Sequence, residues 1–237
     1  MTNKTVQTGL TAIVLAAGSG SRMKSSAPKQ YTLIEGKTVL QHSLDALLAE
    51  PRIQRIIVVV APSDIVGQKL RFDDERVQVA RVGGFTRAMS VKNGLSYATF
   101  TSNEWVLVHD SARPCLLTSD VTKLIDECMS RDRGGILAVP VNDTLKKENG
   151  DRIITRTVSR ESMWAAQTPQ MFRAFDLLEA LDKAGDAVTD EASAMELAGQ
   201  KPILVEGTQT NLKITHQMDL WMAKAIMRYR KDISSGN

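Results

Sequence analysis

Short apolar runs alternate along the chain with stretches in which apolar residues recur at helical spacing. A run that is apolar throughout is typical of a strand buried on both faces, whereas apolar residues three and four apart indicate a helix with one face in the core. We expect strands at residues 12–16, 56–61, 77–82, 105–109, 135–141 and 203–205. We expect helices at residues 38–49, 86–97, 119–131 and 189–199, another directly after Phe172, and a closing helix whose natural N-cap is Thr215.

This alternation predicts an α/β fold with a mainly parallel, twisted sheet that helices cover on both faces. The chain has 237 residues, of which 43% are hydrophobic, so it is long enough to bury one large core. No repeat, low-complexity run or shift in composition marks a boundary. We therefore expect a single domain over residues 1–237.

The alternation is interrupted at residues 142–166. Two extended pieces flank Asn149 and Gly150 there, and an Asn-Gly pair between such pieces is a strong signal of a β-hairpin. An isolated hairpin is only marginally stable in water, so it needs a surface to lie on. Our hypothesis is a protruding arm that packs against a second subunit, and the alternative is a hairpin folded back on its own sheet.

A glycine-rich turn follows the first predicted strand and carries the first candidate chemistry. Residues 17–21 are too small to keep a bound group away from the backbone, and Arg22 and Lys29 follow them. Free backbone N–H groups flanked by cations suit a polyphosphate, although a plain strand-to-helix turn is the alternative. The Gly-Lys-Ser/Thr ending of a Walker A loop is missing, and Met23 stands where a dinucleotide-binding fingerprint needs its third glycine.

Two other predicted strands are also followed by small or ionisable residues. Gly84 comes after the third strand and Asp110 after the fourth. Because ligands of open α/β sheets bind at the carboxyl ends of the strands, we expect these residues to share one site with Gly18.

Charge and composition narrow the kind of ligand and partner. The net charge is only +3, the cations are scattered, and three Trp and three Tyr leave little for base stacking, so we expect a small anionic substrate and no nucleic acid. Cys115 and Cys128 are too few and too far apart for a zinc site or a disulfide scaffold, which indicates a reducing compartment. The sequence shows no secretion signal and no run of 18 apolar residues, so we expect a cytoplasmic protein without a membrane partner.

Eight short blocks, each weak by itself, occur together between about Leu10 and Arg228. They are L-A-A-G-x-G-x-R-M with P-K-Q at 15–30, G-G-x-x-R-x-x-S at 83–90, H-D-x-A-R-P at 109–114, D-T-L-K at 143–146, T-V-x-R at 157–160, T-P-Q at 168–170, T-D-E-A-S at 189–193 and N-x-K-I-T at 211–215. In this order they closely resemble the 2-C-methyl-D-erythritol 4-phosphate cytidylyltransferase family of the non-mevalonate isoprenoid pathway. One departure is Ser111, where alanine is the expected residue.

The resemblance implies a Rossmann-like fold, a homodimer formed through the arm, and transfer of a cytidylyl group from CTP to the substrate's phosphate with release of pyrophosphate. Mg²⁺ is the implied cofactor. A phosphate monoester is mostly dianionic at neutral pH, with a second pKa of about 6, so this nucleophile needs no general base. The protein must bring two anions together and stabilise charge at the α-phosphorus, which makes cations the expected catalysts.

The resemblance also assigns roles to individual residues. The catalytic ones are Arg22 and Lys29, at the α-phosphate, and Arg160 and Lys213, which hold the acceptor. Nucleotide contacts fall to Ala16, Ala17, Gly18, Gly20, Gly84, Ser90 and Asp110, and substrate contacts to Asp110, Arg113, Thr144, Thr168 and Thr189. Asp110 is also the candidate Mg²⁺ ligand. In the family, Thr144 and Arg160 reach the neighbouring subunit's site from the arm.

Two other functions remain open at this point. One is a cytidylyltransferase for another polyol phosphate, such as ribitol 5-phosphate. The other is a non-catalytic nucleotide sensor, although binding alone would not require Arg160 and Lys213 together.

Overall fold

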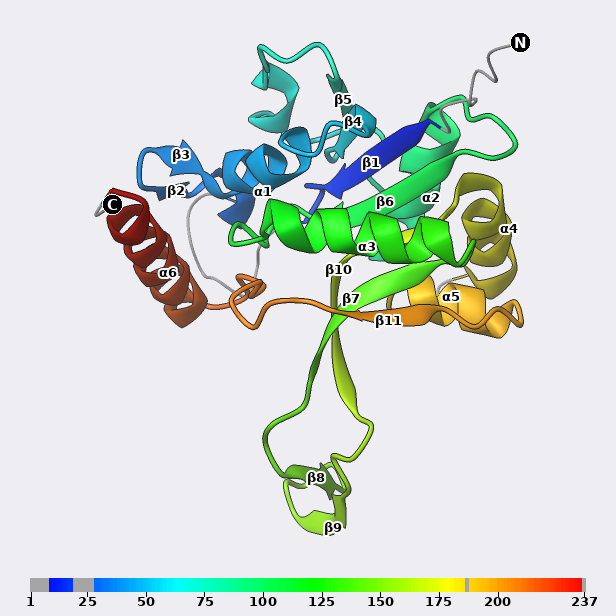
Figure 1. Cartoon of the computed structure of the whole chain (residues 1–237), viewed down its shortest axis with the longest axis vertical. Coiled ribbons are helices and arrows are strands. Elements are labelled where there is room, and N and C mark those ends of the chain that lie inside the picture. Colours follow the sequence, from blue (N-terminus) through cyan, green and yellow to red (C-terminus); the bar gives the residue numbers. More distant parts are fainter. Residues whose placement is uncertain (1–8, 19–27, 186–187, 236–237) are drawn as a thin grey trace.

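A seven-stranded sheet forms the centre of the protein in a computed structural model that describes residues 9–18, 28–185 and 188–235 (Figure 1). In spatial order its strands are β11 (Ile203–Glu206), β7 (Gly135–Pro140), β10 (Trp164–Arg173), β6 (Trp105–Asp110), β1 (Leu10–Leu15), β4 (Ile53–Val59) and β5 (Val77–Ala80). β10 runs antiparallel to both of its neighbours, and all other adjacent strands are parallel. The expected mainly parallel α/β sheet is confirmed.

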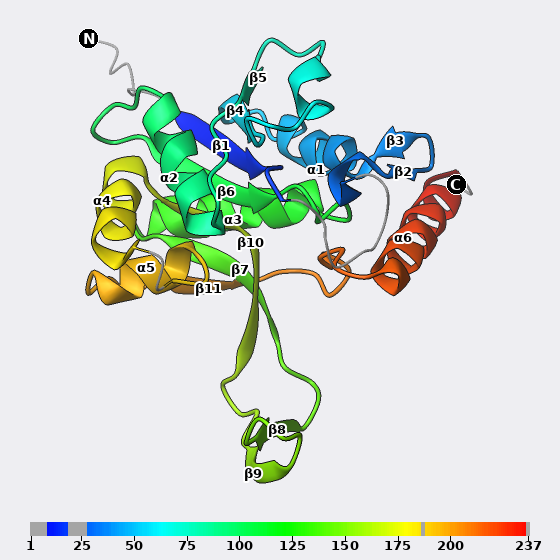
Figure 2. The same cartoon turned by 180° about the vertical axis from the view of Figure 1, so that it is seen from behind.

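Helices cover both faces of this sheet (Figures 1 and 2). They are α1 (Val39–Leu48), α2 (Arg87–Tyr97), α3 (Thr118–Ser130), α4 (Ala174–Ala184) and α5 (Glu191–Leu197). α6 (Gln217–Ser235) lies beside the sheet, and its buried residues join a separate apolar cluster with Ile34, Val39 and Cys115 (Figures 1 and 2). Apolar residues of α1 and α3 share one buried cluster, and those of α2, α4 and α5 share another. No helix in the described ranges is both long enough and apolar enough to span a membrane.

β1 explains why an unbroken apolar run predicted a central strand. Ala12 and Val14 belong to the core cluster under α1 and α3, whereas Ile13 belongs to the cluster under α2 and α4. All three have an exposed fraction of 0%. Because successive side chains of a strand point to opposite faces, a strand covered on both sides needs apolar residues at every position.

The starts of two predicted helices agree with the structure, and in both a threonine hydroxyl caps the first turn. Thr38 accepts a hydrogen bond from the Gln41 N–H at 3.1 Å and begins α1, and Thr86 accepts one from the Met89 N–H at 3.1 Å and begins α2. The predicted N-cap Thr215 is wrong, because α6 begins at Gln217. Thr215 instead donates its hydroxyl to the Asp219 carboxylate, which also accepts the backbone N–H of Thr215. A carboxylate is the stronger acceptor for such groups.

β10 is the principal element that the sequence pattern did not predict. Its buried positions include the polar residues Gln167, Thr168 and Gln170, so it lacks the apolar run of the other strands. The Thr168–Pro169 peptide bond within it is cis.

The hairpin predicted within residues 142–166 is confirmed. β8 (Leu145–Glu148) and β9 (Ile154–Val158) form a separate antiparallel pair, and the Asn149 side chain accepts the Asp151 N–H at 3.0 Å in the turn. Figures 1 and 2 show this arm projecting from the body on the ends of β7 and β10. The alternative of a hairpin folded back on the central sheet is therefore wrong.

Candidate active site

A cavity with a volume of about 410 Å³ lies at the carboxyl ends of β1 and β6. Gly18, Gly84 and Asp110 all line it, as expected for residues that follow three different strands of one sheet. Ala17, Ser90, Lys29 and Lys213 also line it. The cavity therefore gathers residues from both ends of the chain.

One end of the cavity is built from small residues. A Cβ added to Gly83 would lie 2.5 Å from the Ala17 Cβ, and one added to Gly84 would lie 2.4 Å from the Met89 Cβ. These positions must be glycine because no side chain fits there. The Gly84 N–H donates to the Ser90 hydroxyl at 3.0 Å, which holds the turn before α2 against that helix.

Gln30 fixes the end of β1, although the sequence did not single it out. Its side-chain amide donates to the carbonyls of Ala16 and Gly18 at 2.8 and 3.2 Å, and its exposed fraction is 2%. Ala16 is buried beneath this contact. A Cβ added to Gly18 would have no neighbour within 4 Å among the described residues, so space is open beside its backbone.

Asp110 is the centre of the charged end of the cavity. Its Oδ2 lies 2.6 Å from the Lys213 Nζ, and its Oδ1 accepts from the Arg87 Nε at 3.0 Å. Burial by itself would raise the pKa of this carboxyl, but Arg87 and Lys213 outweigh it and hold the pKa well below its usual range. Asp110 is therefore a carboxylate at neutral pH.

A second carboxylate, Glu191 of α5, holds the same arginine. Its two oxygens accept from Arg87 Nη1 and Nη2 at 2.5 and 2.9 Å, and its exposed fraction is 1%. Glu191, Arg87, Asp110 and Lys213 thus form one continuous chain of ion pairs. The sequence analysis missed Arg87 and Glu191 as site residues, although both stand at specified letters of the blocks at 83–90 and 189–193.

Lys29 joins the opening turn to the C-terminal segment. It begins the short 3₁₀ turn η2 (Lys29–Tyr31), directly after Pro28, and its Nζ donates to the Ile214 carbonyl at 2.7 Å. Ile214 follows Lys213, so the two lysines predicted to act on phosphates enter the same cavity. Arg22 and Gly20 lie outside the described residues.

Two predicted substrate contacts lie behind the cavity wall. The Thr168 hydroxyl accepts the Asp110 N–H at 3.1 Å and lies 3.0 Å from His109 Nδ1. Arg113 donates to the Asn211 carbonyl at 2.7 Å. Both residues are buried and hold segments that carry Asp110 and Lys213. His109 is fully buried, and this burial lowers its pKa to about 3, so its ring is neutral.

The remaining predicted residues do not line the cavity of this chain. Thr144 and Arg160 are exposed on the arm, where Arg160 donates to the Asn142 carbonyl. Thr189 is exposed and directly precedes Asp190, the N-cap of α5. Ser111, the departure from the family pattern, donates its hydroxyl to the Leu15 carbonyl at 2.6 Å.

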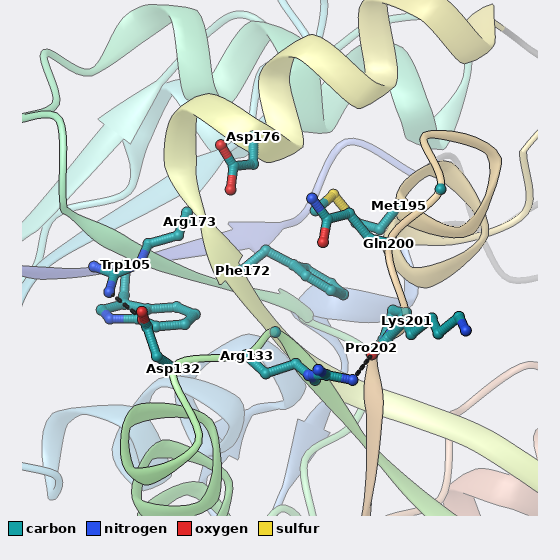
Figure 3. A pocket seen from close by; sticks show the side chains of 12 residues that line it. Trp105, Asp132, Arg133, Phe172, Arg173, Asp176, Met195, Gln200, Lys201 and Pro202 are labelled. Atoms are coloured by element: carbon teal, nitrogen blue, oxygen red, sulfur yellow. Dashed lines mark hydrogen bonds and ion pairs between the residues drawn. The ribbon is translucent and has the colours of Figure 1, made fainter.

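Another cavity, of about 330 Å³, lies at the other ends of the strands, beside the starts of β6, β7 and β11 and the end of β10 (Figure 3). Trp105, at the start of β6, forms one wall, and the Arg173 guanidinium lies 4.0 Å from the centre of its ring. Arg173 also pairs with Asp132 at 2.6 Å. This cavity contains none of the predicted site residues. The cavity around Asp110 is therefore the candidate active site.

Comparison with known proteins agrees with this geometry. The family model described as "IspD: 2-C-methyl-D-erythritol 4-phosphate cytidylyltransferase" matches residues 10–229. The protein of that name from Laribacter hongkongensis is 51% identical over 220 residues, covering 91% of this chain and 95% of its own length. The one from Vibrio parahaemolyticus is 48% identical over 217 residues, covering 90% and 93%. The crystal structure of the Francisella tularensis 2-C-methyl-D-erythritol 4-phosphate cytidylyltransferase superposes with a TM-score of 0.80 at 35% identity, covering 92% of this chain and 100% of that one. The chain belongs to the 2-C-methyl-D-erythritol 4-phosphate cytidylyltransferase (IspD) family.

Proposed function

We propose that this protein transfers the cytidylyl group of CTP to 2-C-methyl-D-erythritol 4-phosphate, releasing pyrophosphate and forming 4-diphosphocytidyl-2-C-methyl-D-erythritol for isoprenoid biosynthesis. Family membership supports this reaction. The observation that carries it is the entry of Lys29 and Lys213, 184 positions apart in the chain, into one cavity around Asp110.

The chemistry follows from the charges of the two substrates. The acceptor phosphate is mostly dianionic at neutral pH and attacks the α-phosphorus without a general base. His109, the nearby imidazole, is fully buried and does not line the cavity, so it cannot reach the acceptor phosphate. Lys29, together with Arg22, would stabilise the charge that develops at the α-phosphate. Lys213 would hold the acceptor phosphate in line for attack.

The nucleotide would lie with its base at the small-residue end and its phosphates at the charged end. Ala17, Gly18, Gly84 and Ser90 offer backbone and hydroxyl groups without bulky side chains, which suits a flat pyrimidine. Asp110 would contact the ribose. Arg113 and Thr168 would position Lys213 and Asp110 through their hydrogen bonds to the backbone of Asn211 and Asp110. Thr189 would lie on the substrate side, next to the N-cap of α5.

Mg²⁺ is the proposed cofactor, and the residues present fit it. Mg²⁺ is usually held by one or two carboxylates together with substrate phosphates. Asp110 is a buried carboxylate, ionised at neutral pH, that lines the cavity. No cluster of three or more His, Cys, Asp or Glu occurs in the described part of the chain, so the phosphates of CTP would supply the other oxygens. When bound, the ion would neutralise charge on the triphosphate. Asp110 would hold the ion from the protein side, and Lys213 would hold the acceptor phosphate.

We also propose a homodimer in which each arm reaches the neighbouring site with Thr144 and Arg160. The arm carries exposed apolar side chains that need a surface, since Ile153 and Ile154 are each 61% exposed. We further propose that residues 1–237 act as one domain in the cytoplasm, supported by the single large sheet and by two buried, free cysteines.

The test is pyrophosphate release with CTP and Mg²⁺, comparing 2-C-methyl-D-erythritol 4-phosphate, ribitol 5-phosphate and no acceptor. We expect release to depend on methylerythritol phosphate. Faster release with ribitol 5-phosphate would move the assignment to another polyol phosphate. If neither acceptor leads to pyrophosphate release, the result would favour a nucleotide sensor.

A further inference from the structure

Phe85 stands out as an aromatic side chain that the protein leaves entirely in solvent. Its exposed fraction is 101%, the highest of the exposed large apolar residues in the described part of the chain. It nevertheless lines the mouth of the cavity, between Gly84 and the α2 N-cap Thr86. Burial of this ring against a ligand would be favourable, and its position offers an apolar surface to whatever enters the cavity.

The two ends of the cavity differ in charge, and Phe85 directly follows Gly84, which lines the uncharged one. Asp110, Arg87 and Lys213 contact one another at the charged end. Ala17, Gly84 and Ser90 line the other end of the cavity, and none of them has a charged side chain. Phe85 is the first residue after the glycine pair that has a side chain.

The backbone on both sides of Phe85 is held in place by hydrogen bonds. The Gly84 N–H is bonded to Ser90 on one side of Phe85, and Thr86 caps α2 on the other. Because the backbone is already fixed, binding has to order only the rotamers of the ring and not the loop that carries it. The negative face of an aromatic ring does not attract phosphate, whereas every nucleobase has a π face that can pack on it.

We propose that Phe85 packs against the base of the bound nucleotide and is one of the residues that determine affinity for CTP. This inference rests on the proposed function, because it takes the cavity to be the CTP site. The base is separated from the reacting α-phosphorus by the ribose, so the contact is the same before and during the reaction. Its loss therefore raises KM for CTP and leaves kcat unchanged.

The test compares wild-type protein with Phe85→Ala, Phe85→Tyr and the control Phe175→Ala. Phe175 is an exposed phenylalanine of the same type in the first turn of α4, with an exposed fraction of 52%, and it does not line the cavity. The dissociation constants of CTP and of inorganic tripolyphosphate are measured by calorimetry, and steady-state kinetics are measured with methylerythritol phosphate. Because Phe85 is fully exposed, its replacement leaves folding intact.

We expect Phe85→Ala to weaken CTP binding about 5- to 150-fold, the range for loss of one base–aromatic contact. Phe85→Tyr retains the ring and stays within about threefold of wild type. Tripolyphosphate, which has no base, binds all variants equally, and Phe175→Ala matches wild type.

Unchanged CTP affinity in Phe85→Ala, or an equal loss for tripolyphosphate, overturns this inference alone. Wild-type protein that binds CTP but transfers nothing to methylerythritol phosphate overturns the proposed function alone. Wild-type protein that does not bind CTP overturns both.

Discussion

Glu191 is the buried end of the ion-pair chain that reaches Lys213, and Glu191→Gln removes its charge while keeping its shape. Both of its carboxylate oxygens accept from Arg87, at 2.5 and 2.9 Å. Arg87 in turn holds Asp110 at 3.0 Å, and Asp110 holds Lys213 at 2.6 Å. We expect this substitution to reduce both stability and activity.

The structure sets the size of the expected effect. Breaking a buried ion pair by removing one partner commonly costs about 3–5 kcal/mol. Four features reduce this figure here. Glutamine still offers one oxygen to Arg87, and Arg87 keeps Asp110 and is 26% exposed at its side chain. Burial also raises the pKa of Glu191 in spite of Arg87, so the charge itself is held at some cost. We therefore expect a loss of about 1–3 kcal/mol in the free energy of unfolding.

The loss of stability is measured by urea unfolding at pH 7. The control is Glu179→Gln, which breaks an exposed pair between Glu179 and Lys183 and costs less than about 1 kcal/mol. Because Glu191 holds the arginine that orients Asp110, we expect kcat/KM with CTP and methylerythritol phosphate to fall about tenfold or more, a loss of about 1.4 kcal/mol of transition-state stabilisation. Glu191→Gln protein that unfolds and reacts like Glu179→Gln would refute this reasoning.

Three further predictions concern the cations, the central carboxylate and the arm. Lys29→Ala lowers kcat about a hundredfold or more, because it removes a cation from the α-phosphate; a near-normal kcat in steady-state assays contradicts its role. The depressed pKa of Asp110 means that its ionised form stabilises the fold above the unfolded value of about 3.9. The gap in unfolding free energy between wild type and Asp110→Asn is therefore widest near neutral pH and narrows as pH falls below about 4; a gap independent of pH is evidence against this. Mixing the inactive variants Arg160→Ala and Lys213→Ala restores about a quarter of wild-type activity, because half of the resulting dimers contain one intact site. No recovery after subunit exchange rules out an arm that acts on the neighbouring site.

The parts of the fold that follow from local pattern could be predicted from the sequence. Residues 56–60 are apolar throughout because β4 is buried on both faces, and Thr86 caps α2 through a contact three residues away. β10 shows the opposite case. Its buried Gln170 is stabilised by Asp190 and by the Ala192 N–H, at 2.8 and 2.9 Å, and these partners are about twenty residues further along the chain. No local periodicity reports such a contact.

Some residues of the candidate site could likewise be predicted from the sequence, and others could not. The glycine-rich turn and Asp110 could be located because they follow predicted strands, whose carboxyl ends meet at one edge of the sheet. The pairing of Arg87 with Glu191 joins residues 104 positions apart, and their burial appears only once α2 and α5 lie on the same face of the sheet. Thr168 and Arg113 were predicted to contact substrate, which stays a prediction, and the structure adds that they hydrogen-bond to the backbone of Asp110 and Asn211. Sequence motifs place such residues near a site but do not give the hydrogen bonds that hold them there.

The most direct measurement of the central claim is transfer of ³²P from [α-³²P]CTP to 2-C-methyl-D-erythritol 4-phosphate, followed in a single turnover with excess enzyme. Wild-type protein should form labelled 4-diphosphocytidyl-2-C-methyl-D-erythritol, and Lys29→Ala and Lys213→Ala should each slow this step about a hundredfold. Absence of labelled product with wild type, or an undiminished rate in both lysine variants, would contradict an active site built on these two cations.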